Sequence, residues 1–278
     1  MMGPLVRAAC ASGQHFSTWR AMRSSQRVLV GVCALVFIAS VAATLAHNAS
    51  MSAMGALPMP GGWSMSTLWM PTCGRTWART AASFIGMWIV MMAAMMLPSL
   101  MPTLLRYRDA VGARASAGRL ALLTVLVTGA YAVVWTVLGV AVFALGASLA
   151  AFELRWLALA RSVPLAAGVV VVLAGVLQFS RWKARRLACC RAKPSLAADA
   201  ASAWRYGLRI GIDCAGCCAG LTAILLVAGM TDLRLMAAVT VATTAERVAP
   251  DGARVARAIG AIAIGVAGLL LVQALSAG

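Results

Sequence analysis

Charged residues, and acidic ones above all, are scarce in this sequence. Only 11% of its 278 residues are charged, with seven Asp and Glu against 24 Lys and Arg, whereas an ordinary soluble domain is about 25% charged. Because 62% of the residues are hydrophobic, the chain could not cover its apolar surface in water. This excludes a soluble globular protein, and the lipid bilayer is the expected partner of a single compact bundle.

Histidine and the common catalytic motifs are also scarce or missing. His15 and His47 are the only histidines, so a His-based catalytic metal site is not expected. The chain has no glycine-rich phosphate loop, no HExxH and no nucleophile elbow. Nothing supports hydrolytic or phosphoryl-transfer chemistry, and we expect a protein that is not an enzyme.

Seven apolar runs, separated by charged or Gly- and Pro-bearing loops, dominate the rest of the chain. No period-two strand pattern appears, and a barrel would not contain such long runs. We therefore predict an all-α, polytopic transmembrane helix bundle of about seven spans. The runs are Val28–Ala46, Ala81–Leu105, Leu120–Leu149, Pro164–Phe179, Ile210–Met230, Leu233–Ala249 and Ala258–Ala277.

The basic residues fall unevenly on the two sides that these runs define. With the N-terminus inside, 19 of the 24 Lys and Arg lie in inner segments, which predicts a multi-pass protein of the cell (inner) membrane with a cytoplasmic N-terminus. Residues 1–27 then form a basic cytoplasmic segment and residues 28–278 the transmembrane bundle. Cleavage of the first run, which follows a signal-like basic leader, would leave six spans.

The net charge of +17 belongs to these loops, where basic residues set the topology and contact anionic lipid headgroups. No stretch interleaves basic and aromatic residues over a soluble module. We therefore expect no nucleic-acid partner.

The most informative stretch has three cysteines, Cys214, Cys217 and Cys218, at positions i, i+3 and i+4. These positions share one face of a helix, in the cytoplasmic half of a predicted span, where thiols stay reduced. Thiolates are soft ligands that select Cu(I), Zn or iron–sulfur centres. Close packing is the alternative, because free Cys is a small hydrophobe and glycines spaced for tight helix contacts flank the cysteines: Gly207 with Gly211, and Gly216 with Gly220.

Methionines form a second pattern, with Met87, Met91 and Met95 at i, i+4 and i+8 and Met96 beside them. Thioethers bind Cu(I) and Ag(I), so this stripe could line a path for an ion. The alternative is that Met fills irregular gaps between helices. The loop after the first run also has spaced His and Met, which would favour inward movement toward the stronger thiol ligands: His47, Met51, Met54, Met59, Met65 and Met70.

Two carboxylates and a further thiol complete the candidate metal ligands. Asp213 and Glu246 lie within predicted spans, where a carboxylate is costly and is either paired, here with a neighbouring Arg, or functional. Cys190 lies in a strongly basic cytoplasmic segment, where positive neighbours favour the thiolate. It could complete a site with the other three cysteines if that segment folds back.

At these motifs the chain resembles the bacterial "predicted metal-binding integral membrane protein" family, a domain of unknown function. The resemblance covers roughly residues 80–265 and implies a membrane protein with a thiol-based metal site. The family usually has other residues where this chain has Arg186, Ile210 and Ala219. The resemblance depends on three blocks: Met92 to Ser99; Ala174 to Gln178 with Lys183, Leu187, Cys190 and Arg191; and Cys214 to Cys218 with Gly229, Asp232, Leu233, Met236, Glu246 and Arg247.

Three functions are compatible with these patterns. The favoured one is binding, and transport, of a soft metal ion through intramembrane Cys and Met, with Cu(I) preferred to zinc and with a metal donor or acceptor protein as partner. A structural or assembly subunit of a membrane complex is one alternative. A membrane thiol oxidoreductase that uses Cys214 and Cys217 is the other.

Overall fold

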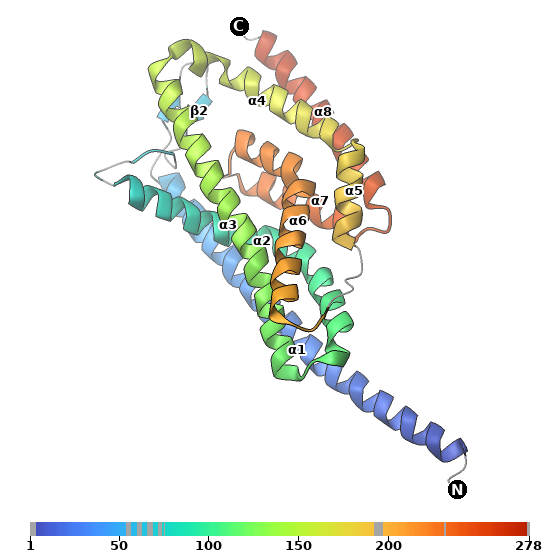
Figure 1. Ribbon diagram of the computed structural model, residues 1–278. Helices are drawn as coiled ribbons and strands as arrows, with labels where there is room; N and C mark the ends of the chain where they lie inside the picture. The colour runs from blue at the N-terminus through green and yellow to red at the C-terminus, as the bar shows by residue number, and fades with distance from the viewer. Residues whose placement is uncertain are drawn as a thin grey trace.

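The chain folds as an all-α protein in the computed structural model, as the sequence predicts (Figure 1). The structure describes residues 4–53, 57–59, 63–65, 69–71, 74, 76–191, 197–230 and 232–276. Two short antiparallel strands, β1 (Leu57–Met59) and β2 (Trp63–Met65), follow the first helix. The helices in this part of the chain are α1 (Pro4–Ala53), α2 (Trp77–Val111), α3 (Ala117–Arg155), α4 (Leu157–Leu177), α5 (Arg181–Arg191), α6 (Ala200–Ala228), α7 (Leu233–Val248) and α8 (Gly252–Ser276), with a 3-10 turn η2 at Gly112–Arg114.

Five segments are long and apolar enough to cross a membrane: Ser24–Ser50, Trp77–Arg114, Ala117–Arg155, Ala200–Ala228 and Gly252–Leu269. A bent pair, Ser162–Leu177 with Arg181–Cys190, forms a sixth if it counts as one span, and its two helices differ in direction by 65°. Over the described residues the number is therefore five or six, and the prediction of seven was too high.

The predicted span Leu233–Ala249 accounts for the difference. Helix α7 has only 16 residues, which gives a length of about 24 Å. The hydrocarbon core of a bilayer is about 30 Å thick. Helix α7 is apolar but too short to be counted as a full crossing.

Helices α3 and α6 run in the same direction and approach each other closely through glycines. A Cβ built on Gly207 would lie 2.4 Å from the carbonyl oxygen of Val127, and one on Gly211 would lie 2.9 Å from the side chain of Val134. Farther along α6, a Cβ on Gly220 would lie 3.1 Å from the carbonyl oxygen of a residue in α4. The glycines of α6 therefore allow the close helix contacts that their spacing indicates.

Helix α2 packs its methionine-rich face into the centre of the bundle. It continues through Pro98 and Pro102 without a break. Trp88 is fully buried; its ring lies over Gly139 of α3, and its Nε1 donates a hydrogen bond to the carbonyl oxygen of Trp135 at 2.9 Å. These contacts hold α2 against α3.

The start of α6 is fixed by a cap that lies outside the membrane-spanning segment. The carboxylate of Asp199 accepts a hydrogen bond from the backbone N–H of Ser202 at 2.8 Å. This hydrogen bond lowers the pKa of the Asp199 carboxyl group. With its first turn capped and its glycines against α3, helix α6 is held with its cysteine face toward the interior.

The close contact of α3 with α6 predicts different effects for two Gly→Ala substitutions. Gly207→Ala should lower the free energy of unfolding by about 1–3 kcal/mol, because its Cβ would overlap the α3 backbone. Gly129→Ala, in α3, is the control: nothing lies within 4 Å of its added Cβ, and it should change stability by less than about 1 kcal/mol. Thermal unfolding in detergent measures both, and equal losses would contradict the packing described here.

Candidate metal centre

Four thiols and one thioether come together where α2, α5 and α6 meet. Cys214, Cys217 and Cys218 lie on one face of α6, and each is at most 1% exposed. The Sγ atom of Cys218 lies 3.9 Å from that of Cys214 and 3.9 Å from that of Cys217. The sulfur of Met96 from α2 lies 4.0 Å from Cys214 Sγ.

The fourth thiol, Cys190, comes from the short helix α5. It is 3% exposed, and its thiol lies next to that of Cys217. The segment that carries Cys190 thus folds back onto α6. We refer to Cys190, Cys214, Cys217, Cys218 and Met96 as the sulfur cluster.

The spacing of the sulfur atoms suits pairwise binding of a metal ion. Two sulfur ligands at about 2.3 Å from one ion are about 3.8 Å apart when the angle between them is tetrahedral. The two measured separations of 3.9 Å are close to this value. In the part of the chain that the structure describes, however, no three or more His, Cys, Asp or Glu side chains are arranged to enclose an ion.

Polar side chains from α3 and α7 contact Cys214, and one from α2 contacts the α7 side chain. Nη1 of Arg247 donates hydrogen bonds to Cys214 Sγ at 3.1 Å and to Ser99 Oγ at 2.9 Å. The hydroxyl of Tyr131 lies 3.1 Å from Cys214 Sγ. All three polar residues are at most 7% exposed. Sequence reasoning missed Tyr131, which carries no local signal, and it placed Ser99 and Arg247 in the resemblance blocks without assigning either a contact with the cysteines.

The two candidate carboxylates make ion pairs. Glu246 accepts from Lys183 Nζ at 2.7 Å, and the two side chains are 0% and 2% exposed. Asp213 pairs with Arg186 at 2.6 Å and more loosely with Arg209 at 4.0 Å. The sequence predicted the pairing of Asp213 with Arg209 as one alternative. It did not predict the partners Lys183 and Arg186, which come from α5 and lie far from Glu246 and Asp213 in sequence. Each carboxylate is thus satisfied by a cation.

The ion pairs of α5 also position the sulfur cluster. Lys183 Nζ donates a second hydrogen bond to the carbonyl oxygen of Cys217, and Arg106 of α2 donates to the carbonyl oxygen of Cys190 at 3.2 Å. Helix α5 is therefore fastened to α2, α6 and α7 at several points along its length. These contacts bring Cys190 to the α6 thiols.

The methionine stripe divides between two faces of α2. Met91 and Met95 are buried at 1% and 2% exposure in the hydrophobic core, and Met87 is half-buried at its edge. Met96 lies against Cys214, with Met92 one turn away on the same face. Among the outer-loop candidates, Met54 lies outside the described residues, as do the side chains of Met51, Met59 and Met65.

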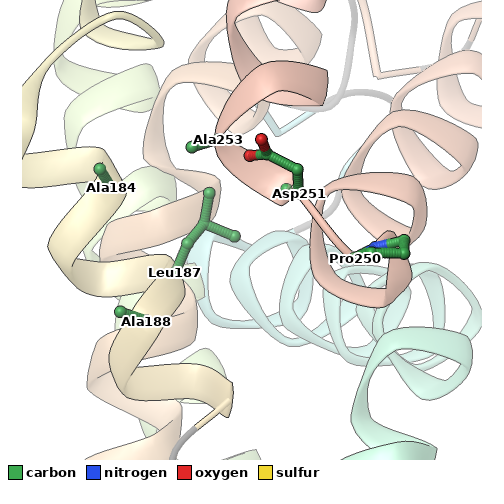
Figure 2. A pocket seen from close by; sticks show the side chains of 7 residues that line it. Ala184, Leu187, Ala188, Pro250, Asp251 and Ala253 are labelled. Carbon is green, nitrogen blue, oxygen red and sulfur yellow. The ribbon is translucent and has the colours of Figure 1, made fainter.

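A hollow of about 390 Å³ lies at the surface between α5 and the turn that joins α7 to α8. Figure 2 shows Leu187 and two alanines of α5 on one wall, and Pro250, Asp251 and Ala253 on the other. Its one ionisable lining residue, Asp251, is paired with Arg254 at 2.8 Å. The hollow therefore lacks the soft ligands that gather in the sulfur cluster.

The fold and the sulfur cluster define a helix-bundle protein with a buried thiol centre. A family model described as "PpoB2: Copper chaperone" matches residues 85–271, and the chain belongs to this family. The match supports the metal-related family that the sequence motifs indicate, and it gives the chain a copper-related role. No curated protein and no solved structure matches the chain.

The buried ion pair between Lys183 and Glu246 predicts strongly non-additive mutations. Lys183→Met alone should lower the free energy of unfolding by roughly 3 kcal/mol, because it leaves a buried carboxylate without its cation. The double variant Lys183→Met, Glu246→Met should recover most of that loss. A double-mutant cycle measured by thermal unfolding in detergent tests this, and additive losses would show that the two groups do not interact.

Proposed function

We propose that this protein binds copper as Cu(I) at the sulfur cluster, within the membrane-spanning bundle, and passes it to or from a partner protein. The observation that carries the proposal is the convergence of four buried thiols and one thioether from three helices. Membership of a copper chaperone family supports copper as the ion. The cell inner membrane, with the N-terminus in the cytoplasm, is the location that the basic loops favour.

The types of side chain in the sulfur cluster favour Cu(I) over zinc. Thiolate and thioether sulfur are soft ligands that suit Cu(I). Structural zinc sites are closed tetrahedra of four Cys or His ligands, and a thioether is not among these ligands. Met96 adds a neutral sulfur, which holds harder ions poorly.

Passing the ion on requires that the sulfur cluster become accessible, because all five of its members are at most 3% exposed. Helix α5 is the short element that carries Cys190, and it follows the 65° bend after α4. Movement of α5 away from α6 would expose the thiols on the side where the basic loops lie. A partner that supplies or receives Cu(I) would meet the site there.

Copper loading of the reduced, detergent-purified protein tests the proposal. We expect close to one Cu(I) per chain in the wild type and near-complete loss in the variant Cys214→Ser, Cys218→Ser, which removes a pair of sulfurs 3.9 Å apart. Cys33→Ser is the matched control, since Cys33 is a buried free cysteine of α1. Elemental analysis gives the stoichiometry.

Each other outcome identifies a different function. Absence of copper in the loaded wild type would overturn the proposal. In that case, a reversible disulfide between Cys214 and Cys217 on redox titration would indicate a thiol oxidoreductase. Thiols that stay free at all potentials in the wild type, together with a stable protein when all three α6 cysteines are changed to Ala, would indicate a structural subunit.

Two pairs of neighbouring residues provide a finer test of which sulfurs bind the ion. Met96→Leu should weaken Cu(I) binding about tenfold, because it removes the thioether next to Cys214, whereas Met91→Leu keeps the core volume and should have little effect. Cys190→Ser should weaken binding more than Cys189→Ser, because Cys189 is exposed on the same helix. Competition with a Cu(I) chelator measures each affinity, and equal effects within either pair would contradict these assignments.

A further inference from the structure

Arg247 of α7 places a permanent positive charge beside the sulfur cluster. Its side chain is 7% exposed, and its Nη1 donates to Cys214 Sγ and Ser99 Oγ. Within the described residues its Nη2 is buried without a hydrogen-bond partner, and no carboxylate forms an ion pair with it. A guanidinium keeps its charge under all ordinary conditions. Its electrostatic complement must therefore come from the sulfur atoms.

The other charged groups around the sulfur cluster balance one another. Lys183 is neutralised by Glu246, and Arg186 by Asp213. Arg106, which contacts the backbone of Cys190, is half-buried, so water screens its charge. Among the described residues that contact the sulfur cluster, Arg247 is therefore the buried cation whose charge no ion pair balances.

A net charge that is removed from water is costly unless it is paired. One Cu(I) with two thiolates carries a charge of −1, which Arg247 makes neutral. A divalent ion with the same two thiolates is already neutral, so Arg247 would leave an excess of +1. The fixed charge next to the sulfur atoms thus distinguishes ions of the same softness by their charge.

We propose that Arg247 is the specificity-determining residue of the sulfur cluster, and that it selects a monovalent soft ion held by two thiolates, Cys214 and Cys218. This inference rests on the proposed function. Nη1 already contacts Cys214, whose sulfur is 3.9 Å from that of Cys218. The unpartnered Nη2 is the donor available to a second thiolate.

Substitution of Arg247 combined with a pair of ions that differ in charge tests this proposal. Ag(I) and Cd(II) are both soft and have the same electron count, so they differ mainly by one unit of charge. In Arg247→Gln the ratio of Ag(I) to Cd(II) affinity should fall roughly 100-fold relative to the wild type, because the bound monovalent complex loses its countercharge. Arg247→Lys retains the charge and should stay within about tenfold of the wild-type ratio.

Two further variants separate charge from structure. Ser99→Ala removes the second hydrogen-bond partner of Arg247 but leaves the charge of Arg247 in place. The ratio of Ag(I) to Cd(II) affinity should therefore stay as in the wild type. Arg247→Met is a second neutral variant, with a flexible side chain that fills irregular space, and it replaces Arg247→Gln if the latter does not fold. Thermal unfolding confirms that each protein is folded, and chelator competition measures the affinities.

The outcomes also separate this inference from the proposed function. If the wild type binds Cu(I) and Ag(I) but the ratio is unchanged in both neutral variants, the role of Arg247 is overturned and the metal site stands. If the ratio of Ag(I) to Cd(II) affinity falls as far in Arg247→Lys as in the neutral variants, the charge of Arg247 is not what selects the ion. If the wild type binds neither monovalent ion, the proposed function fails, and this inference fails with it.

Discussion

The pairing of buried charge is the constraint on which the centre of this molecule depends. A charged side chain away from water must meet an opposite charge or lose its charge. Lys183 with Glu246, and Arg186 with Asp213, satisfy this requirement by joining α5 to α7 and to α6. The same contacts bring Cys190 to the three cysteines of α6. These ion pairs thus connect the helix that carries one sulfur to the helix that carries the other thiols.

Close packing of helices through small residues is the second constraint. A helix in lipid gains little from apolar contact alone, so a stable contact needs the two helices to approach closely. Gly207 and Gly211 let α6 lie against the backbone of α3, which brings Tyr131 to Cys214. Gly139 makes space on α3 for Trp88, so that α2 presents Met96 to the same point. Packing and metal binding are alternative explanations of the α6 motif. In the structure, the glycines occupy helix contacts while the thiols gather with other sulfur and polar groups.

The sequence was sufficient to predict the helical fold, because apolar runs of this length have one main structural solution in lipid. The common face of Cys214, Cys217 and Cys218 also follows from helical periodicity. The number of spans was overestimated because apolar composition does not show that α7 is short or that α4 and α5 are bent. Local spacing likewise could not reveal the partners of Glu246 and Asp213 on α5, since these ion pairs arise from the fold of the chain. Metal binding by the sulfur cluster remains a prediction.

X-ray absorption spectroscopy of the copper-loaded, reduced protein tests the central claim most directly. The account predicts copper in the Cu(I) state with sulfur as its only close neighbours, at about 2.3 Å. A coordination shell of nitrogen and oxygen atoms, or a spectrum unchanged by the substitutions Cys214→Ser and Cys218→Ser, would contradict it. Either result would place the copper-related role of this chain at some other part of the molecule.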